Sequence, residues 1–384
     1  MAARLRAAFY RGGTSKAVVF NAADLPEDFA VRDSIFLAVL GSPDPYGRQL
    51  NGMGGGLSSL SKVVIVSPSA REDADVDYTF VQVAVQEPLA DYGSACGNMS
   101  SCVGPFAVDE GMVPVPKDAD EALVRIFNTN TNQIYHARFP VQDGHPVEEG
   151  ELAIAGVAGT GARVTLDFIA PGGSQTGHLL PTGNARDSLE VGDIGTIEAS
   201  LIDAANPVVY VRASNLGCTA TELPQDLDSD PLLARRVESV RRAGAVRMGL
   251  ATSIDAVRAS NPKVAMVAGP AAFSGLDGTL HEADCHHINV RLVSMGNFHR
   301  AITLTGGLCT AVAAQIPGSL VQELSTATGP LLHIGTSSGV LQVTADVAVT
   351  SDGVWARSAG TLRTQRRLME GAVLYPDHLA GPAA

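Results

Sequence analysis

Two short apolar segments, each preceded by a small glycine-containing loop, constrain the fold more than any other feature of the chain. They read CGNMSSCVGPFAVDEGMV and TGGLCTAVAAQIPGSLV, and they align with Cys96 on Thr305 and Val103 on Val312. A helix that is apolar all round is buried on every side. We therefore predict two central helices, at about 97–111 and 306–317, in two duplicated domains. A match between two helices this short can also arise by chance.

Strand and turn signals alternate around both segments. LRAAFY and AVVF read as the strands of a hairpin joined by the polar loop RGGTSK, and KVVIV reads as a buried strand with Lys62 at its entrance. DPLLARRVESVRRAGAVRMGL is the clearest amphipathic helix, with Asp230 as its N-cap. This alternation of strand, turn and helix signals is typical of α/β chains. We place the two domains at 1–184 and 185–384.

The composition of the chain argues against some kinds of binding partner. The chain has 384 residues, a formal net charge of −13 and 5% aromatic residues, which argues against nucleic acid and anionic membranes as partners. Five cysteines without regular spacing indicate reduced thiols. The N-terminus does not read as a secretory signal, and no apolar run approaches the ~18 residues of a membrane helix. We expect a soluble, cytoplasmic protein whose site, if its ligand is an anion, provides local donors.

Four loops rich in glycine and hydroxyl residues favour a site for a small anion. None fits a nucleotide motif, because Ser15 and Ser61 stand where a phosphate-binding loop needs the glycine before its lysine. Free N–H groups at helix starts and nearby hydroxyls do favour carboxylates. The candidate residues in these loops are Gly13, Thr14, Ser15, Ser58, Ser59, Ser61, Gly97, Asn98, Gly306 and Gly307. Each loop alone is also explained as a turn that needs a positive φ.

Cys96 and two histidine-containing segments hold the other candidate groups. Cys96 comes just before the first helix, where the dipole lowers a thiol pKa, although a buried structural cysteine fits the sequence as well. HEADCHH lacks the spacing of a zinc site, and neighbouring histidines on a strand point to opposite faces, so we predict no metal. His299 precedes the second helix and either contacts a substrate carboxylate or packs.

The ordered blocks of the sequence resemble a known family. RGGTSKAVVF, GSPDPYGRQLNGMGGGLSSLSK, DYGSACGN, PTGN, RMGL and SMGNFHRAITLTGG look like those of the 2-methylaconitate cis-trans isomerases, methylitaconate Δ-isomerases and 4-oxalomesaconate tautomerases, over most of the chain. The resemblance implies a diaminopimelate-epimerase-like fold, α/β of the α+β kind. Each of its two similar domains is a curled, mostly antiparallel sheet around a central helix, with the site in the cleft between them.

The resemblance also implies roles for single residues. Lys62 and Cys96 match the catalytic lysine and cysteine of the family, and Asn184 of PTGN joins the substrate-binding set. A lysine with a lowered pKa can remove a proton near a carboxylate-activated double bond and return one two carbons away. We expect Lys62 to be the main acid/base and Cys96 a second proton donor or an electrostatic partner. Ser15, Ser59 and the helix-start amides would hold carboxylates and the enolate. No metal or organic cofactor is expected, and a homodimer would fit.

Other functions stay open on the sequence. An amino-acid epimerase or racemase of the same fold would need a thiol facing Cys96, but the repeat places Thr305 there and Cys309 is displaced. A non-catalytic carboxylate-binding protein would leave Lys62 with Cys96 unexplained. The substrate is equally open, since methylitaconate, 2-methylaconitate, aconitate and oxalomesaconate differ by small groups, and one methylene is worth only ~1–3 kcal/mol. So is the choice between a double-bond shift and a cis-trans outcome.

Overall fold

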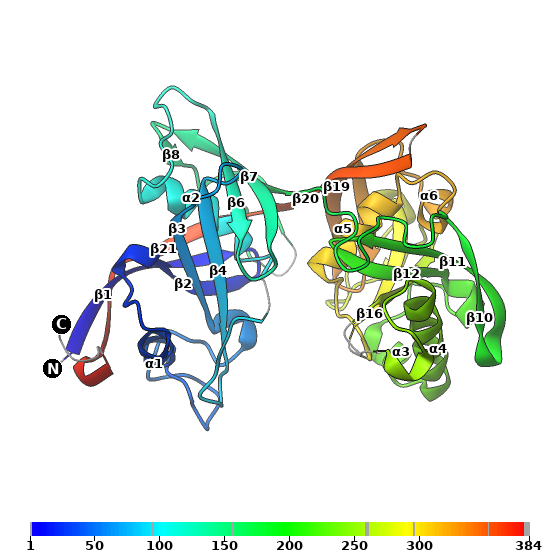
Figure 1. The fold of residues 1–384 in the computed structure, drawn as a ribbon, viewed down its shortest axis with the longest axis horizontal. Helices are drawn as coiled ribbons and strands as arrows, with labels where there is room; N and C mark the ends of the chain where they lie inside the picture. The colour runs from blue at the N-terminus through cyan, green and yellow to red at the C-terminus, as the bar shows by residue number, and fades with distance from the viewer. Residues whose placement is uncertain are drawn as a thin grey trace. The chain divides into compact units, whose positions relative to one another are not determined.

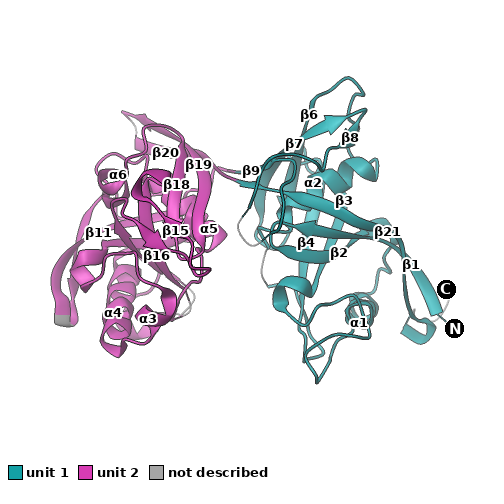
Figure 2. Ribbon diagram, turned by 180° about the vertical axis from the view of Figure 1, so that it is seen from behind, with its two compact units in different colours: residues 1–167, 362–384 teal, residues 168–361 magenta. Residues whose placement is uncertain are grey.

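The computed structural model describes residues 2–93, 96–154, 157–257, 261–294, 296–351 and 353–379. The chain divides into two compact units (Figure 2). Unit 1 is Met1–Asp167 with Leu362–Ala384, and unit 2 is Phe168–Thr361. This division differs from the boundary predicted at 184/185. The last strand, β21 (Gln365–Pro376), pairs antiparallel with the first, β1 (Ala2–Gly12), along its whole length, and this pairing returns the C-terminal segment to unit 1.

The described residues of unit 1 form a twisted sheet with two α-helices (Figure 1). Its remaining strands are β2 (Ser15–Asn21), β3 (Lys62–Pro68), β4 (Val76–Val83), β5 (Ala90–Asp91), β6 (Glu121–Asn128), β7 (Gln133–Gln142), β8 (His145–Pro146) and β9 (Val164–Ile169), which ends in unit 2. The helices are α1 (Phe29–Leu40) and α2 (Ser100–Asp109), with 3-10 turns at Ala22–Asp24, Ser58–Leu60 (η2) and Asp377–Leu379. The predicted hairpin is confirmed, with Arg11 opposite Lys16 across the turn.

Unit 2 has the same kinds of element. Its strands are β10 (Asp187–Val191), β11 (Gly195–Ala204), β12 (Asn206–Arg212), β13 (Lys263–Ala268), β14 (Phe273–Ser274), β15 (Leu280–His281), β16 (Ile288–Ser294), β17 (Asn297–Phe298), β18 (Leu331–Thr336), β19 (Gly339–Thr350) and β20 (Gly353–Arg363), which ends in unit 1. Its α-helices are α3 (Pro224–Asp228), α4 (Pro231–Arg247), α5 (Leu304–Ala313) and α6 (Leu320–Leu324). Short 3-10 turns cover Gly192–Ile194, Ala213–Leu216, Ile254–Ala256 and Ala283–Cys285.

The strands of the two units follow one topology, which supports the predicted duplication. In unit 1 the hairpin β1–β2 is followed by β3 parallel to β2, β4 antiparallel to β3, β6 parallel to β4 and β7 antiparallel to β6. In unit 2 the strands β11, β12, β13, β16, β18 and β19 repeat that sequence of orientations step by step. The predicted α+β class, with mostly antiparallel pairing, is therefore confirmed.

One buried helix lies at the centre of each unit. Every residue of α2 from Ser100 to Val108 is buried, and the helix packs against β1, β3, β6, β7, β8 and β21. Helix α5 is buried from Gly306 to Ala313 and packs against β11, β12, β18 and β19. It ends before the predicted 317, because Pro317 disfavours the helical conformation of the residue before it. Asp230 caps α4 as predicted, accepting hydrogen bonds from Leu232 N and Leu233 N.

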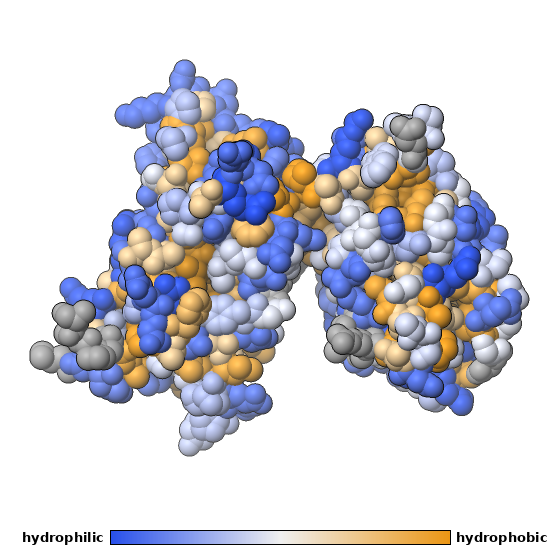
Figure 3. Space-filling model, viewed as in Figure 1, coloured by the Kyte–Doolittle hydropathy of each residue, from blue (hydrophilic) through white to orange (hydrophobic). Residues whose placement is uncertain are grey.

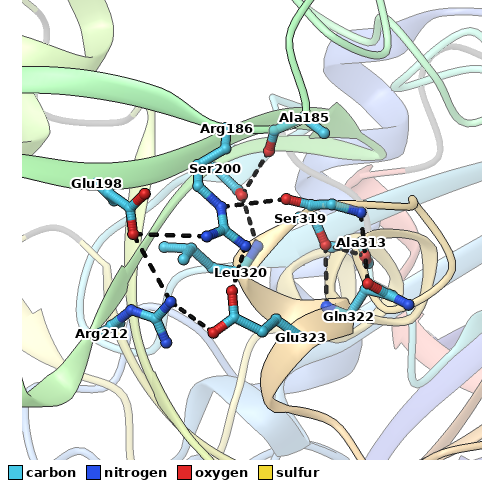
Figure 4. A network of polar contacts seen from close by, with 11 residues as sticks. Ala185, Arg186, Glu198, Ser200, Arg212, Ala313, Ser319, Leu320, Gln322 and Glu323 are labelled. Carbon is cyan, nitrogen blue, oxygen red and sulfur yellow. Dashed lines mark hydrogen bonds and ion pairs between the residues drawn. The ribbon is translucent and has the colours of Figure 1, made fainter.

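A polar network fixes α6 on the sheet of unit 2 (Figure 4). Ser200 on β11 donates its hydroxyl to the carbonyl of Ala185 (2.7 Å) and accepts from the N–H of Leu320 (2.9 Å). Glu323 of α6 then accepts from Arg212 (2.7 Å) and pairs with Arg186. A buried hydroxyl thus satisfies a backbone N–H at the start of this short helix, and ion pairs of Glu323 hold its last turn to Arg186 and Arg212.

The described residues contain no helix long and apolar enough to cross a membrane. Hydrophobic and hydrophilic residues are interspersed over the face drawn in Figure 3, as on an ordinary protein surface.

Candidate active site

Lys62 lies buried at the start of β3, with only 7% of the residue exposed. Its Nζ atom lies 2.6 Å from Oε1 of Gln82, the residue opposite it on β4, and 4.9 Å from the ring centroid of Phe80. Burial lowers the pKa of the Lys62 amine, and the nearby Cys96 raises it by less. An amine with a lowered pKa, held by a neutral acceptor, is present in its neutral, basic form more often than an ordinary lysine amine.

The serine and glycine loop before Lys62 is built around a buried glutamine. Gln49 is fully buried, and its Nε2 donates to the hydroxyls of Ser42 (2.8 Å) and Ser61 (2.7 Å). Ser61 in turn donates to the carbonyl of Val83 (2.9 Å). A Cβ on Gly54 would collide with the Gln49 side chain, so this glycine is required for close packing. Ser61 therefore stabilises the loop, and the substrate contact that the sequence suggests for it stays a prediction.

Ser58 and Ser59 lie in a turn that contacts Gln82. Ser58 is exposed and Ser59 is half-buried in the 3-10 turn η2. The carbonyl of Ser58 accepts from Nε2 of Gln82 (3.0 Å), and so does the carbonyl of Ser61 (2.8 Å). The turn thus connects the predicted serine block to the residue that contacts Lys62.

The CGN turn before α2 is stabilised by hydrogen bonds to the carbonyl of Cys96. Cys96 is half-buried, and its carbonyl accepts from the Tyr78 hydroxyl (3.3 Å) and from the N–H of Ser100 (3.0 Å). Gly97 and Asn98 follow in a half-buried turn that leads into the helix. Residues 94 and 95, in the same predicted block, lie outside the described residues.

The RGGTSK hairpin lies directly on this turn. Nδ2 of Asn98 donates to the Thr14 hydroxyl (3.0 Å), and a Cβ on Gly12 would come within 2.7 Å of the Asn98 carbonyl. Gly13 has a φ of +50°, and a Cβ there would collide with the Asn98 amide. Ser15 is buried at the first position of β2. The structure thus brings the first predicted loop and the CGN turn together, and it explains both glycines by close approach.

Three residues near Lys62 and Cys96 were missed by the sequence analysis: Phe80, Gln82 and Arg363. Arg363, at the end of β20, donates from Nε to Oδ1 of Asn98 (3.3 Å) and from Nη1 to the Leu362 carbonyl (2.9 Å). Burial lowers the pKa of its guanidinium to about 10, and Cys96 raises it by less. No local pattern points to Arg363, because it lies 265 positions from Asn98 in the chain.

The remaining predicted residues belong to unit 2. Nδ1 of His299 accepts from the N–H of Ala301 (3.1 Å), and burial lowers the pKa of the imidazole. Asn184 donates to Asp187 (3.2 Å), a carboxylate that also accepts from Thr182 (2.6 Å) and Arg247 (2.9 Å). The PTGN and RMGL blocks therefore meet at one buried carboxylate.

The two glycines of α5 are occupied by its N-cap. The N–H of Gly306 donates to the Thr303 hydroxyl (3.0 Å), and the N–H of Gly307 donates to the Thr303 carbonyl (2.9 Å). A Cβ on Gly306 would lie 2.6 Å from Leu292. These contacts give both glycines a capping and packing role, and the substrate contact expected from the sequence stays a prediction.

The histidines of HEADCHH face aromatic partners. His281 stacks on Phe273 (4.8 Å between ring centroids), His286 meets the same ring edge-on (5.3 Å), and His287 stacks on His333 (4.9 Å). Within the described ranges, no group of three or more His, Cys, Asp or Glu side chains is arranged to hold a metal ion.

Comparison with known proteins decides the family. The sequence profile of the family described as PrpF protein matches residues 2–376. The chain belongs to the PrpF family. Named relatives of this PrpF chain include the 2-methyl-aconitate isomerase of Shewanella oneidensis, 39% identical over 97% of both chains. The 3-methylitaconate isomerase of Eubacterium barkeri is 37% identical, over 96% of this chain and 97% of the relative. The 4-oxalomesaconate tautomerase of Pseudomonas putida is 36% identical, over 99% and 98%.

A solved structure agrees with the fold of the PrpF chain. The crystal structure of a methylitaconate-delta-isomerase superimposes with a TM-score of 0.91, at 35% identity, over 100% of this chain and 98% of that chain. The diaminopimelate-epimerase-like fold predicted from the sequence is confirmed, and the PrpF chain is an isomerase.

Proposed function

We propose that this PrpF chain moves a proton within an unsaturated di- or tricarboxylic acid, with the amine of Lys62 as the main acid and base. The observation that carries the proposal is the buried Lys62 amine, whose pKa burial lowers and whose position Gln82 holds, beside Cys96. The relatives are named for 2-methyl-aconitate, 3-methylitaconate and 4-oxalomesaconate, all unsaturated polycarboxylates. Acids of this class are the substrates we propose.

The reaction needs one base that keeps the proton it takes. The neutral Lys62 amine removes a proton from the carbon next to the carboxylate-activated double bond, and the electron pair spreads into an extended enolate. The resulting ammonium returns a proton two carbons away, which shifts the double bond. Rotation within the enolate before the proton returns gives a cis-trans outcome. In both cases the net change is an isomerisation, and Lys62 ends as it began.

Cations and hydrogen-bond donors hold the charge that develops. Arg363 brings a guanidinium to the Asn98 side, where it suits a substrate carboxylate in a protein of net charge −13. Thr14, Ser15, Gly97 and Asn98 form the rest of this proposed anion side, and Ser58 and Ser59 border Lys62. Cys96 serves as a second proton donor or an electrostatic partner. Contributions from Asn184 and His299 stay predictions.

A two-thiol racemase is disfavoured by the chemistry of Cys309. This thiol is fully buried, donates to the carbonyl of Ile202 (3.6 Å), and has a pKa raised to about 12 by burial. A cysteine in this state does not provide a second thiolate near neutral pH.

The cytoplasmic location, the homodimer and the absence of a cofactor also stay predictions.

The test is solvent exchange followed by proton NMR. Purified protein in D₂O is incubated with methylitaconate, 2-methylaconitate, aconitate and oxalomesaconate in turn. We expect deuterium to enter a methyl, methylene or vinyl position of at least one acid, because each turnover returns a proton from the solvent-exchanged lysine. Exchange with none of the acids would contradict the proposal. Exchange at the α-carbon of an amino acid would then support a racemase, and tight binding of an acid without exchange would support a carboxylate-binding protein.

A further inference from the structure

We infer that Gln82 is a positioning residue that sets both the direction and the charge state of the Lys62 amine. The inference rests on the proposed function of Lys62 and adds a residue to which the sequence pattern assigns no role. Gln82 lies opposite Lys62 in the register of β3 and β4, so the two side chains leave the sheet together.

The orientation of the Gln82 amide is fixed by backbone carbonyls. Its Nε2 lies 3.0 Å from the carbonyl of Ser58 and 2.8 Å from that of Ser61, with the Val83 carbonyl at 3.4 Å. Carbonyl oxygens only accept hydrogen bonds, so the NH₂ group must face them. Oε1 is therefore the atom that meets Nζ of Lys62 at 2.6 Å. One amine hydrogen always points to Gln82, and the nitrogen lone pair of the neutral amine points elsewhere.

The neutral charge of this acceptor matters as much as its direction. A carboxylate at the same place would pair with the ammonium form and raise the lysine pKa. An amide oxygen accepts from both the ammonium and the amine, so burial remains the dominant influence and the pKa stays lowered. A glutamine at position 82 thus keeps Lys62 available as a base.

Among the described residues, one other titratable group acts on the charge of Lys62. Cys96, before α2, is the titratable group whose charge raises its pKa, and Arg363 of β20 lies beside Cys96 in turn. From β4 the amine also meets the face of Phe80, a weak attraction for the cation. The substitution that changes the charge beside the amine most directly is therefore Gln82→Glu.

The test measures the lysine itself and does not depend on the substrate. The chain's lysines are Lys16, Lys62, Lys117 and Lys263, so a protein with ¹³Cε-labelled lysine gives a short set of NMR signals. Lys62 is assigned by its loss in Lys62→Ala. Each titration is run on the wild-type protein, Gln82→Glu, Gln82→Met and Gln142→Glu, a control with the same charge change at an exposed end of β7.

Opposite shifts are expected from the two variants at position 82. The titration midpoint of Lys62 should rise in Gln82→Glu, leaving roughly tenfold less neutral amine at pH 7. It should fall in Gln82→Met, which offers no oxygen to the ammonium. Gln142→Glu should match the wild-type protein. A Lys62 midpoint that stays at the wild-type value in either folded variant would overturn the inference.

The activity arm separates this inference from the proposed function. With a substrate found by solvent exchange, the pH dependence of kcat/KM in Gln82→Glu should shift to higher pH together with the Lys62 titration, while the KM at the new optimum stays near the wild-type value. A shifted titration without any exchange in the wild-type protein would support the role of Gln82 and contradict the proposed function. Solvent exchange by the wild-type protein, together with a Lys62 titration that does not shift in Gln82→Glu, would support the proposed function and contradict the role of Gln82.

Discussion

At the scale of single residues, the unusual feature is a lysine placed where a cation is costly. Lys62 is buried like its apolar neighbours on β3, yet it carries an amine. Buried charge is ordinarily paired with an opposite charge. Here the contacts are a neutral amide and an aromatic ring, and burial lowers the pKa of the amine. Such a residue costs stability and is typical of a functional site.

This cost predicts how stability depends on pH. Because the Lys62 pKa is lower in the folded chain than in the unfolded chain, the unfolded chain binds the proton more readily. The resulting loss in free energy of unfolding is greatest at pH values below the folded pKa. The penalty disappears as pH rises toward the ordinary value of 10.5. Lys62→Met avoids this penalty and should be the more stable protein at low pH. Its advantage over the wild-type protein in free energy of unfolding should shrink as the pH rises through the lowered pKa toward 10.5, by at most about 1.4 kcal/mol per pH unit.

Urea unfolding at several pH values checks this prediction. Lys117→Met, at an exposed position, is the matched control and should keep a constant difference from the wild-type protein. The same pH dependence in Lys62→Met and Lys117→Met would show that the Lys62 amine carries no such penalty.

At the scale of elements, the central helix α2 depends on residues without side chains. Gly104 faces the sheet, and a Cβ there would lie 2.8 Å from the ring of Phe139 and 3.1 Å from Cβ of Ala137. Helix α5 uses Gly306 in the same way, against Leu292. These glycines let each helix approach the strands that surround it, and α2 presents the CGN turn at its start.

Enlarging Gly104 should therefore destabilise unit 1. We expect Gly104→Val to lower the free energy of unfolding by about 1–3 kcal/mol, because overpacking forces the sheet or the helix to shift. The midpoint of urea unfolding measures the loss. Gly329→Val, at an exposed position with open space around it, is the control. Equal midpoints in the two variants would show that α2 is not tightly enclosed.

At the scale of the whole molecule, the sequence predicts what is local and misses what is distant. The RGGTSK hairpin, the Asp230 cap and the two apolar helices all follow from residues near in the chain. Gln82 contacts Lys62 from 20 positions away, on the next strand of the sheet, and could be named only once the register was known. The return of β21 to unit 1 and the place of Arg363 depend on pairing between the two ends of the chain.

The serine and glycine patterns of the loops predict anion-binding residues only in part, for a physical reason. A serine next to glycines can hold an anion or satisfy the backbone, and the sequence looks the same in both cases. The structure assigns Ser61 to the second use through Val83 and Gln49. It assigns the amides of Gly306 and Gly307 to the N-cap of their own helix.

The most direct test of the central claim is chemical rescue of Lys62→Ala in D₂O. With the acid that the wild-type protein exchanges, the variant should lose exchange by roughly 10²–10⁴-fold. Ethylamine or propylamine should then restore part of the rate in proportion to its concentration, because a small amine can occupy the space of the missing side chain. Lys117→Ala should exchange at the wild-type rate and gain nothing from amines. Exchange by Lys62→Ala at the wild-type rate, with no amine added, would show that Lys62 is not the base.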